Sequence, residues 1–248
     1  MSRHDTIDQA FILAAGFAKR MRPLTDTLPK PLALMGGRPI LSHIIDELVN
    51  VGVQHIVING HHCVEKMHDY MPVIRAEHPT VKFTLSVEDE ILETGGGLVY
   101  ALQQGYIDKT KPFYMINGDA YWVSDTSENT LLALQREWNK TDKDMVMLVQ
   151  PTDTMTLGTQ VGDYNINNGG VLTRSLDQSG SHMFMGVRIL HPRLMDGHEA
   201  TCFSFLKIMD EAEAKNTLKG YSHKGEWYHI STLDDLETAN RVLFQQAS

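Results

Sequence analysis

The stretch that decides the fold is AFILAAG at residues 10–16, a short apolar run closed by a glycine. An apolar run of this length without polar alternation is typical of a strand buried on both faces of a parallel sheet. The residues that follow are polar and include Pro23, so we expect a long loop after the strand and not a helix. The chain therefore opens with a buried strand whose carboxyl end leads into a loop.

Helical and strand-like patterns then alternate along the chain. Apolar residues recur at helical spacing over 39–49, and a β-branched run covers 55–59, which together indicate a βαβ unit. The same reading predicts further helices over 64–71, 97–104, 128–140, 203–215 and 233–245, and further strands over 82–87, 113–116, 145–149 and 220–230. Such alternation predicts an α/β fold with a mostly parallel sheet and with ligands bound at the carboxyl ends of its strands.

The pattern changes between residues 163 and 187. Asn-Asn-Gly-Gly at 167–170 and Gln-Ser-Gly at 178–180 are typical of turns between short strands, so this segment is predicted to be a hairpin-rich insert. We find no repeat, low-complexity segment or linker in the sequence. Residues 1–248 are therefore predicted to form a single domain.

Charge and cysteine content narrow the class of protein. The formal net charge is -9, from 22 Lys and Arg against 31 Asp and Glu, which argues against nucleic acid or an anionic membrane as a partner. Cys63 and Cys202 lie far apart and offer neither a disulfide framework nor metal-ligand spacing. Residues 1–9 lack the apolar segment of a signal peptide, so a cytoplasmic location without membrane contact is expected.

The loop after the first strand has the residues that bind polyphosphate. It reads LAAGFAKRMRPLT at 13–25 and is followed by PKPL at 29–32. Small residues let backbone N–H groups approach an anion, and cations neutralise its charge. Here the small residues are Ala14, Ala15 and Gly16, and the cations are Arg20, Arg22 and Lys30. The loop lacks the glycines of the dinucleotide fingerprint and of the Walker A loop. The alternative is a surface loop whose cations are merely solvated.

These segments resemble the signature loop of the sugar-1-phosphate nucleotidyltransferases, roughly L-A-A-G-x-G-x-R-x-x-P-L-T followed by P-K-P-L. The resemblance implies that the loop wraps a triphosphate, that Arg20 contacts its phosphates and that Lys30 steadies them during transfer. Ala18 stands where the family has its second glycine. The resemblance covers about residues 10–243 and implies a Rossmann-like three-layer α/β/α fold. Its nucleotide-binding part is expected at about 10–125 and its sugar-binding part at about 126–248.

A second segment reads SVEDEILETGGG at 86–97, between a predicted strand and a predicted helix. Three successive glycines permit positive φ, and the next helix starts with unpaired N–H groups, which suits a nucleoside pocket; a flexible turn is the alternative. The segment resembles the base-binding segment of the family, in the form found in N-acetylmuramate-1-phosphate uridylyltransferases. The resemblance implies that Gly95 and Gly96 contact the nucleoside, that Glu88 accepts hydrogen bonds from the base, and that Glu93 faces the sugar.

Two further segments concern a metal ion. Asn117-Gly118-Asp119 ends a predicted strand, where a carboxylate can hold a divalent cation on triphosphate oxygens; alone, the tripeptide is more often a turn. It resembles the metal-binding Gly-Asp of the family, which implies Asp119 as a catalytic magnesium ligand, with manganese as the alternative ion, and Asn117 as a nucleotide contact. The late segment WYHISTLDDL at 227–236 resembles W-x-D-I/V-G-T-x-E-x-L. His229 thus stands where the family has its second metal-binding aspartate. A purely structural role for this histidine is an equally open alternative.

The predicted insert carries the residues expected to meet the sugar. Gly-Asp-Tyr at 162–164, Phe-Met-Gly-Val at 184–187 and His-Pro at 191–192 are similar to sugar-pocket segments of the same uridylyltransferases, which implies sugar contacts by Asp163 and Gly186. The Glu-Lys-Pro of many hexose-1-phosphate members is absent from the sequence. The sugar phosphate must then be neutralised by Arg188 or by the metal ion.

The implied reaction is attack by a sugar 1-phosphate oxygen on the α-phosphorus of a nucleoside triphosphate, with release of pyrophosphate. UTP with N-acetylmuramate 1-phosphate, or a related amino sugar phosphate, is the expected pair, and the chain is expected to act as a monomer or small homo-oligomer. A guanylyltransferase for mannose- or heptose-1-phosphate is the alternative. A third hypothesis is a non-catalytic nucleotide-sugar sensor, because Ala18, His229 and Ser231 depart from the family pattern.

Overall fold

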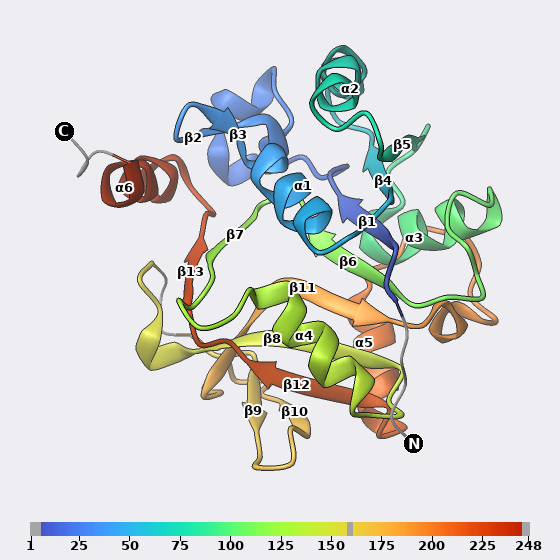
Figure 1. The fold of residues 1–248 in the computed structure, drawn as a ribbon, viewed down its shortest axis with the longest axis vertical. Coiled ribbons are helices and arrows are strands. Elements are labelled where there is room, and N and C mark those ends of the chain that lie inside the picture. Colours follow the sequence, from blue (N-terminus) through green and yellow to red (C-terminus); the bar gives the residue numbers. More distant parts are fainter. Residues whose placement is uncertain (1–5, 158–160, 245–248) are drawn as a thin grey trace.

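The computed structural model describes residues 6–157 and 161–244 (Figure 1). Nine strands of this part of the chain form one mixed sheet in the order β10-β9-β11-β6-β1-β4-β5, and β8 and β12 continue it beyond β11. These strands are β1 (Gln9–Leu13), β4 (His55–Gly60), β5 (Lys82–Val87), β6 (Phe113–Asn117), β8 (Met145–Pro151), β9 (Tyr164–Ile166), β10 (Leu172–Arg174), β11 (His182–Leu190) and β12 (Leu218–Ser222).

The strands β5, β4, β1 and β6 run parallel, as the unbroken apolar run of β1 predicts. Leu13 pairs with Asn117 across β1 and β6, so the carboxyl ends of these strands meet at one edge. Asn59, near the end of β4, lies at the same edge. The loop after β1 and the segment after β6 therefore leave the sheet side by side.

The second half of the chain extends the same sheet. β11 pairs antiparallel with β6 and with β8, and β12 runs parallel to β8. The predicted hairpin is confirmed in β9 and β10, which pair antiparallel around a turn in which Gly170 N–H donates to the Asn167 carbonyl at 2.9 Å. The mixed sheet is thus continuous across both expected functional parts, and their division near residue 125 stays a prediction.

Helices cover both faces of the sheet and give the predicted three layers (Figure 1). The helices α1, α2, α4 and α6 pack with one core cluster, and α3 and α5 pack with the other. Their bounds are α1 (Ile40–Asn50), α2 (Val64–Glu77), α3 (Glu93–Gln103), α4 (Thr130–Asn139), α5 (Leu206–Ala214) and α6 (Leu233–Phe244). Within the described ranges, no helix combines the length and the apolar character needed to cross a membrane.

Short elements complete the fold. Two-stranded sheets join β2 (Leu34–Met35) to β3 (Arg38–Pro39), and β7 (Ala120–Val123) to β13 (Glu226–His229). The 3-10 turns are η1 (Lys19–Met21), η2 (Leu24–Asp26), η3 (Lys30–Leu32), η4 (Thr152–Thr154) and η5 (Pro192–Met195). The first three of these turns lie in the loop after β1, which confirms that no long helix follows the first strand.

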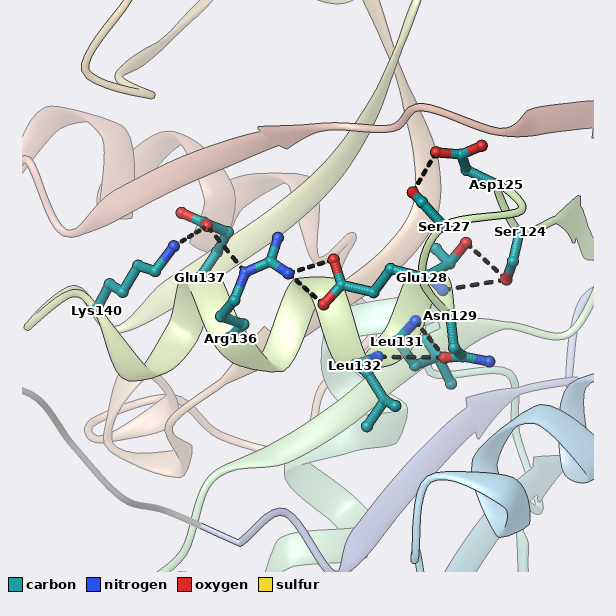
Figure 2. A network of polar contacts seen from close by, with 11 residues as sticks. Ser124, Asp125, Ser127, Glu128, Asn129, Leu131, Leu132, Arg136, Glu137 and Lys140 are labelled. Carbon is teal, nitrogen blue, oxygen red and sulfur yellow. Dashed lines mark hydrogen bonds and ion pairs between the residues drawn. The ribbon is translucent and has the colours of Figure 1, made fainter.

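The amino end of α4 shows how local sequence sets a helix boundary (Figure 2). Asn129 caps the helix, because its Oδ1 accepts hydrogen bonds from the N–H groups of Leu131 at 2.9 Å and Leu132 at 3.2 Å. Arg136 pairs with Glu128, which precedes the cap. The helix therefore begins one residue after an asparagine.

Several predicted boundaries are wrong. The strand expected over 220–230 is two strands, because Ser222 still pairs with Val149 of β8 whereas Glu226 already pairs with Val123 of β7. The helix expected over 97–104 begins at Glu93, and the one expected over 64–71 continues to Glu77. The end of the last predicted helix at residue 245 lies outside the described residues.

Candidate active site

An open cavity of about 520 Å³ lies at the carboxyl edge of the parallel strands. Its lining comes from the loop after β1, the end of β4, the start of α3, the end of β6 and the segments before α5 and α6. Eight predicted site residues line it: Ala14, Ala15, Gly16, Arg20, Lys30, Glu93, Asn117 and Asp119. Topology thus brings together residues that are up to about a hundred positions apart in the chain.

The loop after β1 holds a left-handed backbone at Ala18, with φ 45° and ψ 46°. This conformation favours glycine, because it places an alanine Cβ close to the carbonyl oxygen that follows. The Ala18 carbonyl accepts hydrogen bonds from Met21 N–H at 2.9 Å and from the Thr25 hydroxyl at 3.0 Å. The neighbouring contacts therefore keep the turn that a glycine would adopt more easily.

A chain of buried hydrogen bonds ties this loop to α3. Ala14 N–H donates to Asn59 Oδ1 at 2.6 Å, and Asn59 Nδ2 donates to Glu88 Oε1 at 2.6 Å. The second oxygen of Glu88 accepts from Leu92 N–H at 3.0 Å. Burial raises the pKa of Glu88, which is 3% exposed. Both carboxylate oxygens of Glu88 are thus bonded within the protein, and its side chain does not line the cavity.

The glycines of the ETGGG segment lie inside α3 and none has a positive φ, so the helix start predicted at residue 97 is too late. The N–H groups of Gly95 and Gly96 both donate to the Phe203 carbonyl, at 2.9 and 3.3 Å. A Cβ on Gly96 would lie 1.9 Å from the Thr201 carbonyl oxygen, and one on Gly95 would lie 2.3 Å from the Phe203 ring. These glycines are required by the close approach of residues 201–203, which the sequence pattern does not reveal.

Lys30 and Asp119 form an ion pair at the centre of the cavity edge. Lys30 Nζ donates to Asp119 Oδ2 at 2.6 Å and also to the backbone carbonyl of Ile230. Lys30 lies in η3 between Pro29 and Pro31, whose restricted backbones fix the direction of the chain. The pair joins the loop after β1, the end of β6 and the segment after β13.

His229 lies beside this pair. Its strand neighbour across β7 and β13 is Ala120, the residue after Asp119. Its Nε2 shares a 2.5 Å hydrogen bond with the Ser231 hydroxyl, and its ring packs edge-on against Trp227. Burial lowers the pKa of His229, while nearby Asp119 acts in the opposite direction. Asp119 and His229 are thus the two groups here suited to a divalent cation, and no cluster of three His, Cys, Asp or Glu ligands occurs in the described ranges.

The residues predicted to meet the sugar are spread over a wider area. Glu93 is exposed at the cavity edge with a left-handed backbone, φ 56°. Asp163 Oδ2 accepts from Phe184 N–H at 3.3 Å and does not line the cavity. Gly186 has φ 78°, and a Cβ there would lie 2.9 Å from Asn117, so it gives that cavity residue its space. Arg188 is 2% exposed, behind the cavity wall.

Residues 10–223 match the model of the MobA-like NTP transferase domain, which covers most of the chain. The chain belongs to this family. The resemblance to the sugar-1-phosphate nucleotidyltransferases is thereby confirmed, and the chain is an enzyme of this kind.

Two relatives resemble the chain over most of its length. The N-acetylmuramate alpha-1-phosphate uridylyltransferase of Caulobacter vibrioides is 28% identical over 225 residues, 89% of this chain and 90% of that protein. The mannose-1-phosphate guanyltransferase of Debaryomyces hansenii is 31% identical over 232 residues, 92% of this chain and 62% of that protein.

The fold is also found in solved nucleotidyltransferases. UDP-glucose pyrophosphorylase in complex with UDP-glucose has a TM-score of 0.77 at 16% identity, covering 97% of this chain and 99% of that one. The agreement confirms the predicted Rossmann-like α/β class for this NTP transferase.

Nine residues that line the cavity were not predicted as site residues: Leu13, Ala18, Lys19, Pro31, Asn59, Ile91, Thr94, Ser204 and Ser231. Asn59 carries the same signal as Asn117, a polar residue at the carboxyl end of a parallel strand, and could have been found by that rule. Thr94 Oγ1 accepts a hydrogen bond at 2.8 Å from the N–H group of Phe205, the residue after Ser204. No local pattern predicts this contact between residues that are 111 positions apart.

Proposed function

We propose that this NTP transferase moves a uridylyl group from UTP to N-acetylmuramate 1-phosphate or a related amino sugar phosphate, giving a UDP-sugar and pyrophosphate. The observation that carries the proposal is the cavity where Arg20, Lys30 and Asp119 meet on the loops of a nucleotidyltransferase sheet. The choice of substrates rests on the Caulobacter relative, which matches nearly the full length of both chains.

In the proposed reaction an oxygen of the sugar phosphate attacks the α-phosphorus of UTP, and the bond from that phosphorus to the bridging oxygen breaks. No covalent bond to the protein forms, so positioning and charge neutralisation supply the catalysis. The backbone of Ala15 and Gly16 receives the triphosphate, and Ala14 lines the cavity with its N–H group bonded to Asn59. Arg20 contacts the phosphates, and Lys30 stabilises the charge that develops during transfer.

Magnesium fits the donor set that the structure offers. Asp119 is bonded to Lys30 through Oδ2 only, and its side chain is 40% exposed. One carboxylate and the His229 imidazole suit a cation that keeps few protein ligands and binds mainly to substrate phosphates; manganese tolerates the imidazole better. When bound, the metal ion supplies further neutralisation of the triphosphate. Replacing Asp119 by Ala is expected to raise the magnesium concentration needed for activity more than replacing His229 by Ala does.

For Glu88, Gly95 and Gly96 we propose roles that differ from those expected from the sequence. Because the oxygens of Glu88 and the N–H groups of Gly95 and Gly96 are bonded within the protein, we propose that these residues shape the nucleotide side of the cavity without touching the base. Asn117 stays a proposed nucleotide contact, and Glu93 stays a proposed sugar contact. Asp163 and Gly186 are proposed to hold the wall at β11 in place.

A guanylyltransferase for mannose- or heptose-1-phosphate is the second candidate, favoured by the Debaryomyces relative. The sensor hypothesis loses part of its basis, because Ala18 keeps the left-handed turn in spite of its methyl group. The cytoplasm and a monomer or small homo-oligomer remain our proposals for location and assembly.

A matrix of four nucleoside triphosphates against a panel of sugar 1-phosphates, read by pyrophosphate release with magnesium, tests the proposal. The highest kcat/KM is expected for UTP with N-acetylmuramate 1-phosphate. Preference for GTP with a mannose or heptose phosphate would favour the second candidate. No pyrophosphate from any pair would contradict both.

A further inference from the structure

Arg188 is a buried charge for which the described residues provide no counter-charge. The residue is 2% exposed and lies toward the carboxyl end of β11. Its Nε is enclosed without a hydrogen-bond partner, and no ion pair joins Arg188 to a carboxylate of the described residues. Burial lowers the pKa of Arg188 to about 9, which leaves the guanidinium cationic at neutral pH. An isolated buried charge is costly, so its presence calls for a partner that arrives from outside.

The surroundings of Arg188 are aromatic. The guanidinium carbon lies 5.1 Å from the centre of the Phe184 ring and 4.4 Å from that of Phe205. Such cation–π contacts stabilise a guanidinium but leave its N–H groups without acceptors. The Nε–H group of Arg188 is thus held beside two aromatic rings without an acceptor.

These aromatic surroundings back onto the wall of the cavity. Phe205 N–H donates to Thr94 Oγ1 at 2.8 Å, and both Thr94 and Ser204 line the cavity. Gly186, two residues before Arg188, lies against the cavity residue Asn117. Phe184 is only partly buried, whereas Phe205 is 2% exposed.

The part of the cavity lining nearest to Arg188 differs from the part with the expected reaction centre, and Arg188 itself is not among the lining residues. Lys30 and Asp119 join the segment after β13, while Thr94 and Ser204 belong to the segments around α3 and α5 on the other face of the sheet. In the proposed reaction the 1-phosphate of the sugar lies at Lys30 and Asp119, so this group does not also serve as the partner of Arg188.

We propose that Arg188 recognises a carboxylate that the acceptor sugar carries in addition to its 1-phosphate. This inference rests on the proposed function, because N-acetylmuramate differs from N-acetylglucosamine by a lactyl ether that ends in a carboxylate. A planar carboxylate matches the guanidinium fork and accepts two parallel hydrogen bonds. Arg188 is then a specificity-determining residue that separates acidic from neutral amino sugars.

The test compares two acceptors that differ in the carboxylate alone, N-acetylmuramate 1-phosphate and N-acetylglucosamine 1-phosphate, each with UTP. Arg188→Met keeps an unbranched apolar stem beside the rings but removes the guanidinium and its charge. Loss of a hydrogen bond to a charged group typically costs about 1.5–3 kcal/mol, or roughly a 10- to 150-fold change. We expect kcat/KM for the acidic sugar to fall by that factor and kcat/KM for the neutral sugar to change less than about threefold.

Arg193→Met is the matched control, because Arg193 pairs with Asp144 at the surface and its side chain is 49% exposed. Its kcat/KM values are expected to equal those of the unchanged protein for both sugars. Equal losses for both sugars in Arg188→Met would overturn the proposal and indicate a role toward the phosphate or in folding. Unchanged values for both sugars would overturn it as well.

A binding measurement keeps the test independent of whether Arg188→Met folds. The unchanged protein is expected to bind UDP-N-acetylmuramate at least about tenfold more tightly than UDP-N-acetylglucosamine, as measured by calorimetry. Equal affinities would overturn the proposed role of Arg188. Activity with both acceptors would still support the proposed function in that case. Absence of pyrophosphate release with either acceptor would instead count against the proposed function itself.

Discussion

The side-chain nitrogen of Lys30 lies 2.6 Å from Oδ2 of Asp119, which joins a cation of the loop after β1 to the carboxylate that follows β6. The Lys30 side chain is 10% exposed, whereas the Asp119 side chain is 40% exposed, so the pair lies at the boundary between the core and the cavity. Charge placed there acts on a ligand in the cavity and little on the core.

Replacing Lys30 by Ala is therefore expected to reduce turnover far more than stability. Loss of a charge-assisted contact made in the transition state typically costs about 2.7–4 kcal/mol, or roughly a hundred- to thousandfold in kcat. Pyrophosphate release and thermal unfolding measure the two effects. Lys66→Ala, at an exposed position of α2, is the control and should leave kcat unchanged. Unaltered turnover in Lys30→Ala would remove Lys30 from the site.

Glu88→Gln is expected to lower kcat/KM for every triphosphate by a similar factor. The substitution weakens the hydrogen bonds from Asn59 and Leu92 and thereby loosens the position of Ala14, without changing a contact to the base. The panel of triphosphates measures this, and the order of preference should stay the same. A changed order would contradict the positioning role and support direct reading of the base by Glu88.

Alanine substitutions at two glycines should separate binding from folding. A Cβ on Gly16 has no protein atom within 4 Å, whereas one on Gly96 would lie 1.9 Å from the Thr201 carbonyl oxygen. Gly16→Ala is expected to keep the unfolding temperature but to weaken nucleotide binding, because the added methyl group occupies space beside the cavity. Gly96→Ala is expected to lower the free energy of unfolding by about 1–3 kcal/mol. Calorimetric unfolding and nucleotide titration distinguish the outcomes; the reverse assignment would refute this account.

Ala18→Gly is expected to raise the free energy of unfolding slightly. A left-handed alanine costs about 1–2 kcal/mol, and the greater backbone freedom of glycine in the unfolded chain offsets about 0.5–1 kcal/mol of the gain. The net stabilisation should then lie between about 0 and 1.5 kcal/mol, with activity retained. Ala76→Gly, at an exposed position of α2, should destabilise instead. A destabilised Ala18→Gly protein would show that the methyl group contributes contacts that outweigh the strain.

His223 should make stability depend on pH below neutrality. It is 5% exposed, its Nδ1 and Nε2 lie 2.8 Å from Gln150 Oε1 and 2.9 Å from Thr130 Oγ1, and burial lowers its pKa to about 4. The unfolded chain binds a proton near pH 6.5, so the stabilisation is present above about pH 6.5 and is lost as pH falls toward 4. Between pH 7 and 5 the loss amounts to about 2 kcal/mol.

Urea unfolding at several pH values checks this dependence in the unchanged protein and in His223→Gln. The variant should lack this loss of stability between pH 7 and 5, apart from the contributions of other groups that both proteins share. His68→Gln, at an exposed position of α2, should behave like the unchanged protein. Identical pH dependence in His223→Gln and the unchanged protein would show that another group controls acid stability.

The order of strands and helices followed from the sequence because its periods are local. The unbroken apolar run of β1 and the helical spacing of α1 are each read within a few residues. The single strand expected over 220–230 was wrong because its two halves pair with different partners, Val149 and Val123, and strand pairing is not a local property. The start of α3 was wrong for a similar reason, since Phe203 supplies the acceptor for Gly95 and Gly96.

By itself the sequence determined which side chains could hold a triphosphate, because Arg20, Lys30 and Asp119 follow strands whose carboxyl ends must meet at one edge. Only the tertiary structure decided which polar groups remain available to a ligand. Glu88 is satisfied by Asn59 and Leu92, whereas Arg188 is buried without a counter-charge among the described residues. Hydrogen bonding and burial depend on contacts between segments far apart in the chain, so no stretch of sequence contains them.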